Sequence, residues 1–87
     1  MDVKKRNGRR ESFAPNKVAA SVTKAGAPPE VAEKIAESTG THFTGTIESS
    51  AIRDYVLEEL RNRGHESVAS SWEKFEREEK GRVGDNF

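Results

Sequence analysis

Apolar residues recur at helical spacing along most of the chain, and prolines and glycines separate them into segments. Val18 and Val22 stand four residues apart, which places both on one face of a helix. Pro15 suits the first position of that helix, and Gly26 is a natural left-handed terminator. The pattern predicts a first helix over about residues 15–25.

Two further helices are predicted in the middle of the chain. The second is opened by Pro28-Pro29-Glu30, is expected to be short and the least apolar of the helices, and ends near Gly40. The third has the best-defined apolar stripe, with Ser49 as its N-terminal cap and Gly64 as its stop. That stripe consists of Ile52, Tyr55, Val56 and Leu60.

A fourth helix is predicted over about residues 66–80. Trp72 and Phe75 share its apolar stripe, and at this spacing we expect both to lie in the core rather than to stack on a ligand. A polar tail over residues 81–87 follows, and no linker divides the rest, so residues 1–80 are expected to form one domain. A solvated, acidic helix face is expected from Glu76, Glu78 and Glu79.

The segment before the first helix has a different pattern. Short runs with β-branched or aromatic outer ends flank Asn7-Gly8, which is typical of a tight β-hairpin. A two-residue loop would point Val3 and Phe13 to opposite faces. A three-residue loop from Arg6, with Gly8 as a left-handed bulge, puts both on one face, so we expect this register. The shared face then holds Val3, Lys5, Arg9, Glu11 and Phe13.

The hairpin and the helices together predict the fold class. A two-stranded hairpin is not stable alone in water, so it must pack on the helices. The expected fold is therefore α+β, with an N-terminal two-stranded β-hairpin against four helices. A chain of 87 residues can bury only a modest core.

Charge changes this picture only locally. The chain has 15 basic and 15 acidic residues, which argues against a surface that grips nucleic acid or an anionic membrane as a whole. Residues 1–18, however, carry six cations against two acids, whereas residues 64–87 carry six acids against four cations. The absence of cysteine excludes disulfides and thiolate metal sites. Without a signal peptide or a long apolar run, we expect a cytoplasmic location.

The cations of the hairpin suggest a phosphate site. The expected register sets Lys5 opposite Arg9, and like charges so placed destabilise a strand pair unless an anion lies nearby. Lysine and arginine bind phosphate in complementary ways, as point charge and as planar fork. Lys17 and the N-terminus of the first helix could add to the site, so a triphosphate fits it.

Two other interpretations of these cations stay open. A solvated, charged strand edge keeps sheets from joining, and proteins use lysine and arginine for this purpose. A grip on a nucleic-acid backbone is the other interpretation. The hairpin has no interleaved aromatic residues and the chain no identifiable recognition helix, which counts against that grip.

Catalytic motifs are missing from the sequence. There is no Walker-type loop ending in Lys-Ser/Thr, no nucleophile elbow and no carboxylate cluster for Mg²⁺. His42 and His65 are isolated, so no metal site is expected. Glu11 is better explained as a charge partner of the cations than as a base. We therefore expect that the chain is not an enzyme.

The order and spacing of these residues closely resemble the ATP-cone. This small regulatory nucleotide-binding domain stands at the N-terminus of many ribonucleotide reductases and occurs in the bacterial repressor of reductase genes. The resemblance covers about residues 2–78 and implies a hairpin lid over a four-helix bundle, with ATP or dATP bound between them. The residues that carry it are Val3, Lys5, Arg6, Asn7, Gly8, Glu11, Phe13, Lys17 and Val18, followed by Ile47, Ser49 and Ile52.

The resemblance also implies roles for single residues. It assigns Lys5 and Arg6 to the phosphates, and Asn7 and Gly8 to a turn near the base. Ala14 departs from the family pattern, because Asp or Asn usually caps the first helix there. Together with the charge pattern, the resemblance predicts a nucleotide site formed by Val3, Lys5, Arg6, Asn7, Gly8, Arg9, Glu11, Lys17, Ser49 and Arg53.

The expected function follows from this site. We expect a stand-alone regulatory module that binds ATP or dATP, which could carry Mg²⁺, between the hairpin and the helices. It would signal to a regulated protein, or through self-association, by a change of conformation or association state. The alternative is a protein-interaction or nucleic-acid-binding adaptor that keeps the ATP-cone fold with little affinity for nucleotide.

Overall fold

The computed structural model describes residues 1–78, which form four helices and three short strands. The helices are α1 (Pro15–Lys24), α2 (Pro29–His42), α3 (Ser49–Asn62) and α4 (Glu66–Glu78). The strands are β1 (Asp2–Lys4), β2 (Arg10–Ser12) and β3 (Thr46–Glu48). The predicted α+β class is confirmed. The predicted polar tail, residues 81–87, lies outside the described residues.

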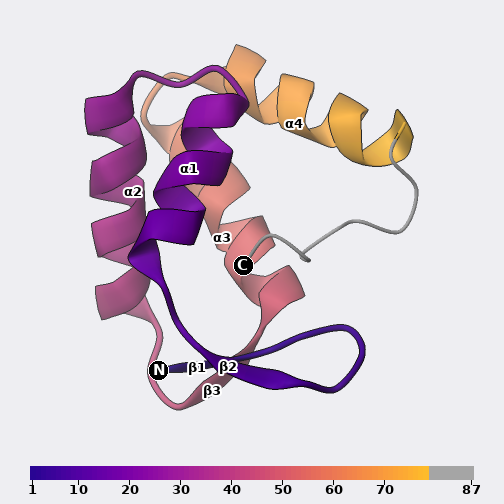
Figure 1. Ribbon diagram of the computed structural model, residues 1–87. Coiled ribbons are helices and arrows are strands. Elements are labelled where there is room, and N and C mark those ends of the chain that lie inside the picture. The colour runs from indigo at the N-terminus through magenta and orange to yellow at the C-terminus, as the bar shows by residue number, and fades with distance from the viewer. Residues whose placement is uncertain (79–87) are drawn as a thin grey trace.

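The sheet and α4 lie at opposite ends of the helical layer. Figure 1 shows α1 and α2 side by side, with α3 behind them and α4 across the upper end. The sheet crosses the lower end, next to the first turns of α1 and α3 (Figure 1). The hairpin therefore covers the end of the bundle at which α1 and α3 begin.

The hairpin has the three-residue loop that the sequence predicts. Val3 pairs with Glu11 across the antiparallel strands β1 and β2. The loop is closed by a backbone hydrogen bond of 2.9 Å from the N–H of Gly8 to the carbonyl of Lys5. Gly8 has a φ of 87°, the left-handed conformation that glycine adopts without a steric penalty. The predicted register is therefore confirmed.

A third strand extends the predicted two-stranded hairpin. β3 pairs in parallel with β1, so the order of the sheet is β2-β1-β3. Gly45, with a φ of 79°, turns the chain into this strand, and its carbonyl accepts a 2.9 Å hydrogen bond from the N–H of Asp2. β3 has only three residues, which is too short for an alternating pattern to be recognised.

The sequence makes one prediction about the N-terminal cap of α1 and one about that of α3. α1 begins at Pro15, and Ala14 supplies no side-chain hydrogen bond to its first turn, as the sequence predicts. The prediction that Ser49 caps α3 is wrong. Glu48 holds the cap position, and Ser49 lies inside the first turn with 2 % of its surface exposed. The small side chain of Ser49 allows this turn to pack closely against the protein interior.

The prediction of a short second helix is also wrong. α2 has 14 residues and continues past Gly40 to His42. The ring of Phe13 lies against this helix, because a Cβ at Gly40 would be 3.4 Å from Phe13 Cε2, which is about van der Waals contact. The linker between β2 and α1 thus packs against the last turns of α2.

The core is continuous from the sheet to α4. Val3 is fully buried at the sheet end, and Trp72, 8 % exposed, closes the far end, so its predicted core position is confirmed. Phe75, predicted to lie in the core, is 47 % exposed. α4 packs on α3, and its buried residues are Val68, Ala69 and Trp72. The next inward position is Glu76, which binds Arg53 of α3, rather than Phe75. Within residues 1–78, no helix has the length and hydropathy that a membrane crossing needs.

Candidate functional site

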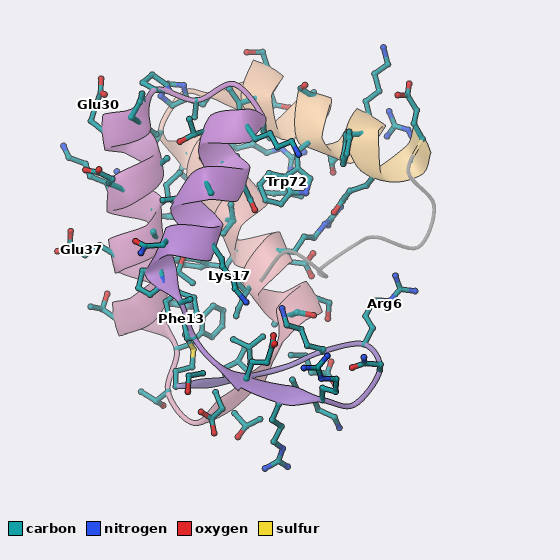
Figure 2. The ribbon with its side chains drawn as sticks, viewed as in Figure 1. Arg6, Phe13, Lys17, Glu30, Glu37 and Trp72 are labelled. Atoms are coloured by element: carbon teal, nitrogen blue, oxygen red, sulfur yellow. The ribbon has the colours of Figure 1, made fainter. Side chains whose placement is uncertain are left out.

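The inner face of the hairpin brings three cations onto one carboxylate. Lys5 Nζ lies 3.3 Å from Glu11 Oε2, and Arg9 Nη2 lies 3.8 Å from Glu11 Oε1. From α1, Lys17 Nζ approaches Glu11 Oε2 to 3.8 Å. Figure 2 shows the Lys17 side chain directed from α1 toward the hairpin. We call Lys5, Arg9, Lys17 and Glu11 the cation cluster.

This arrangement follows from the register of the hairpin. The pairing of Val3 with Glu11 sets Lys5 opposite Arg9, and the N–H of Lys5 donates a 2.7 Å hydrogen bond to the carbonyl of Arg9. Side chains two residues apart on a strand point to the same face. Arg9 and Glu11 therefore share the inner face with Lys5, as predicted.

The charges of the cluster do not cancel. Three cations and one carboxylate give a formal charge of 3 − 1 = +2. The hydrogen bond from Lys5 is the main cause that lowers the pKa of Glu11, and the charges of Lys17, Lys5 and Arg9 lower it further. Glu11 is therefore ionised at neutral pH. Even with this negative charge counted, the formal charge of the cluster is +2.

The cluster is open to solvent on one side. The side chains of Arg9 and Lys17 are 72 % and 48 % exposed, whereas that of Lys5 is only 11 % exposed. An anion arriving from water would therefore meet Arg9 and Lys17 first. Lys5 lies deeper and is held by its ion pair with Glu11.

The hairpin loop is ordered by its own side chain. Asn7 Oδ1 accepts a 3.0 Å hydrogen bond from the backbone N–H of Arg9. This bond fixes the residue that follows Gly8 and so orients the start of β2. Arg6 projects from the loop well apart from Lys17 (Figure 2). A contact of Arg6 with a nucleotide stays a prediction.

The remaining predicted site residues lie beside or below the cluster. Val3 is 0 % exposed, so its side chain belongs to the core and supports the strand from beneath. Ser49 directly follows Glu48, which pairs with Lys4 in the sheet, and it is buried at the start of α3. Their contact with a nucleotide stays a prediction.

Arg53 is held by α4 rather than by the hairpin. Its Nε donates to both carboxylate oxygens of Glu76 at 3.1 Å, and its Nη2 also donates to Glu76 Oε1. A further bond of 2.8 Å runs from Nη1 to Asp54. The bonds to Glu76 are the main cause that raises the pKa of Arg53 above its usual range.

Glu76 is the residue that the sequence interpretation missed. It was expected on a solvated face, but its side chain is only 9 % exposed, and Trp72 Nε1 donates to its Oε2 at 2.9 Å. The Trp-x-x-x-Glu spacing places both side chains on one helix face. That spacing is a signal that this acid shares the inward face with the tryptophan.

The site offers several donors for an anion and a single carboxylate, that of Glu11. Among residues 1–78, no group of three or more acidic, histidine or cysteine side chains could hold a metal ion. A multiply charged anion matches the donor set of the cluster, two ammonium groups and one guanidinium.

A comparison with protein families matches residues 1–77 to the model of the ATP cone domain. A search of curated proteins finds no match.

Proposed function

Because the chain belongs to the ATP-cone family, whose domains are regulatory nucleotide-binding modules, we propose that it binds the triphosphate of ATP or dATP at the cation cluster. The observation that carries this proposal is the convergence of Lys5, Arg9 and Lys17 on Glu11 with a formal charge of 3 − 1 = +2. A triphosphate brings the negative charge that this face of the hairpin lacks.

Each cation has a distinct part in the proposed site. The exposed guanidinium of Arg9 offers a planar fork to one phosphate, and the ammonium group of Lys17 offers a point charge from α1. Lys5 supports both from the protein side, and Glu11 keeps the three cations converged until the ligand arrives. Any Mg²⁺ would be held mainly by the phosphates, since no group of three or more acidic, histidine or cysteine side chains within residues 1–78 could hold a metal ion by itself.

The first turn of α1 also favours an anion here. No side chain caps this helix, so its first backbone N–H groups lack a side-chain acceptor. The helix dipole places partial positive charge at the same end. Because β2 leads into α1 through Phe13 and Ala14, this helix end adjoins the hairpin.

The regulatory step is a shift of population. The bound nucleotide relieves the repulsion between Lys5 and Arg9 and joins the hairpin to α1. It thereby favours one conformation or association state over another, by its difference in affinity for the two. The receiver of that signal is a regulated protein or a second copy of the chain.

Thermal melting tests the proposal. A ligand that binds only the folded chain stabilises it by about 2.7 kcal/mol at a hundredfold excess over its dissociation constant. For a domain of this size that corresponds to a rise of roughly 10–20 °C in melting temperature. We expect ATP and dATP to produce this rise, with ADP and AMP progressively weaker.

Two results would overturn the proposal. One is an equal melting temperature in ATP, dATP, GTP and buffer, together with no heat of binding in calorimetry. The other is salt-sensitive binding to duplex DNA without any response to nucleotide, which would favour an adaptor that has kept only the fold.

A further inference from the structure

Four hydrogen bonds converge on the carboxylate of Glu76. Three come from the guanidinium of Arg53 and one from the indole N–H of Trp72. A carboxylate offers about four acceptor positions, so Glu76 is close to saturation. With 9 % of its side chain exposed, Glu76 is also largely removed from water. This is an unusual environment for an acid on the last helix of a small domain.

The carboxylate of Glu76 presents to Arg53 what a phosphate would present. A guanidinium binds carboxylate and phosphate oxygens through the same pair of parallel N–H groups. Arg53 cannot give its best-aligned donors to both partners at once, because Nε and Nη2 already bind Glu76. A phosphate at Arg53 would have to displace Glu76.

The position of Arg53 makes such an exchange possible. Ser49 opens α3 directly after Glu48, which pairs with Lys4 in β1, one residue before Lys5 of the cation cluster. Arg53 follows four residues later, about 6 Å along the helix axis. The end of α3 that carries Arg53 is therefore the end that the hairpin covers.

We propose that Glu76 is an internal competitor that holds Arg53 in the nucleotide-free chain and yields it to the bound triphosphate. The inference rests on the proposed function and adds a link between the cation cluster and α4. When Arg53 leaves, the carboxylate of Glu76 loses three of its four hydrogen bonds and α4 loses an ion pair to α3. Binding at the hairpin is thereby reported to the C-terminal half of α4.

Competition of this kind lowers the affinity for the ligand. If Arg53 is bound to Glu76 for most of the time, only a fraction of the molecules can bind the ligand with Arg53. The apparent affinity is then lowered by that fraction. Glu76→Gln keeps the size of the side chain and an acceptor for Trp72, but it removes the charge that binds Nε and Nη2 of Arg53 and leaves only the bond from Nη1 to Asp54. We expect this variant to bind ATP about tenfold more tightly than the parent chain.

The chain offers a matched control for this variant. Arg61 Nη2 and Glu73 Oε1, 2.6 Å apart, form a second ion pair between α3 and α4. Glu73→Gln therefore removes the same charge from the same helix without touching Arg53. Its affinity for ATP should equal that of the parent. An equal gain in both variants would show a general effect of net charge and would overturn the inference.

Trp72 provides a second readout. It is the single tryptophan of the chain, and it donates a hydrogen bond to the carboxylate in question. We expect ATP to change its fluorescence in the parent and in Glu73→Gln, and to change it much less in Glu76→Gln. The Nε–H resonance of Arg53 in NMR should shift with ATP over the same concentration range.

The outcomes separate this inference from the proposed function. If the parent binds ATP but Glu76→Gln binds it equally well, Glu76 does not compete and only the inference fails. If the parent shows no binding but Glu76→Gln does, Glu76 blocks Arg53 without yielding it, so the competition stands but the exchange and the proposed function of the parent are both wrong. If neither chain binds ATP, both are wrong.

Discussion

Lys5 and Arg9 lie directly opposite each other in the hairpin, joined by a 2.7 Å backbone hydrogen bond, and their side chains approach the same carboxylate. Two like charges so placed repel each other, and Glu11 supplies only one negative charge between them. Glu11 thus offsets only part of the repulsion between the two side chains in the folded chain. A ligand that brings more negative charge would offset the rest, which favours its binding.

The first prediction concerns Arg9. Arg9→Gln should leave the free energy of unfolding without nucleotide unchanged or slightly higher, because it removes a like-charge contact at an exposed position. The same change should weaken ATP binding about tenfold, since a charge-assisted hydrogen bond is lost. Calorimetric titration measures the affinity. Lys34→Gln, an equal charge change on an exposed position of α2, should leave it unaltered.

The second prediction concerns the pH dependence that Glu11 confers. The fold lowers the pKa of Glu11 below its ordinary value near 4.5, so the unfolded chain takes up this proton more readily than the folded one. The stability from Glu11 is fully present above that ordinary value and is lost as the pH falls through the lower, folded value. Between these limits the parent chain should lose melting temperature faster than Glu11→Gln. Parallel pH profiles for both chains would contradict the assignment.

The third prediction tests the loop. Gly8 has a φ of 87°, and no atom lies within 4 Å of the position that a Cβ would take. Gly8→Ala should therefore cost only the backbone penalty of the left-handed conformation, about 1 kcal/mol in urea unfolding. Gly8→Asn should cost less, because asparagine tolerates this conformation better. A larger loss for asparagine than for alanine would speak against a left-handed Gly8.

The fourth prediction tests how the sheet is attached to the helices. Val3 is fully buried, so Val3→Ala should lower the free energy of unfolding by about 2 kcal/mol through lost burial and the cavity that remains. Val31→Ala removes the same atoms from a half-buried position on α2 and should cost less. Urea unfolding of both variants gives the comparison. Equal losses would mean that Val3 is not a central contact of the core.

The register of the hairpin could be predicted because two demands agree. Val3 and Phe13 both need the core, and only the three-residue loop with Gly8 as its bulge gives them the same face. Both the turn residues and the apolar residues lie within one short segment, so their agreement can be recognised in the sequence. The convergence of Lys5, Arg9 and Glu11 follows from the same register.

The missed strand and the misplaced Phe75 concern contacts between distant segments, whereas the cap of α3 and the end of α2 are errors of local boundaries. β3 exists because Thr46–Glu48 pairs with β1 from far along the chain, and three residues carry no pattern of their own. Phe75 was misplaced because the apolar residues of α4 are compatible with two orientations of the helix about its axis, one with Phe75 inward and one with Glu76 inward. The structure has the second orientation, in which Glu76 binds Arg53. A tertiary ion pair of this kind leaves no periodic trace in a single sequence.

The parallel strand β3 has a mechanical consequence for the hairpin. β1 is bonded on both edges, to β2 and to β3, and Val3 anchors it from below. The root of the ribbon is therefore clamped, and the backbone hydrogen bond between Lys5 and Arg9 leaves only the loop of residues 6–8 beyond the paired positions. We therefore expect a ligand-induced movement of the hairpin to be a pivot of this loop about its paired base, with the largest displacement at the tip.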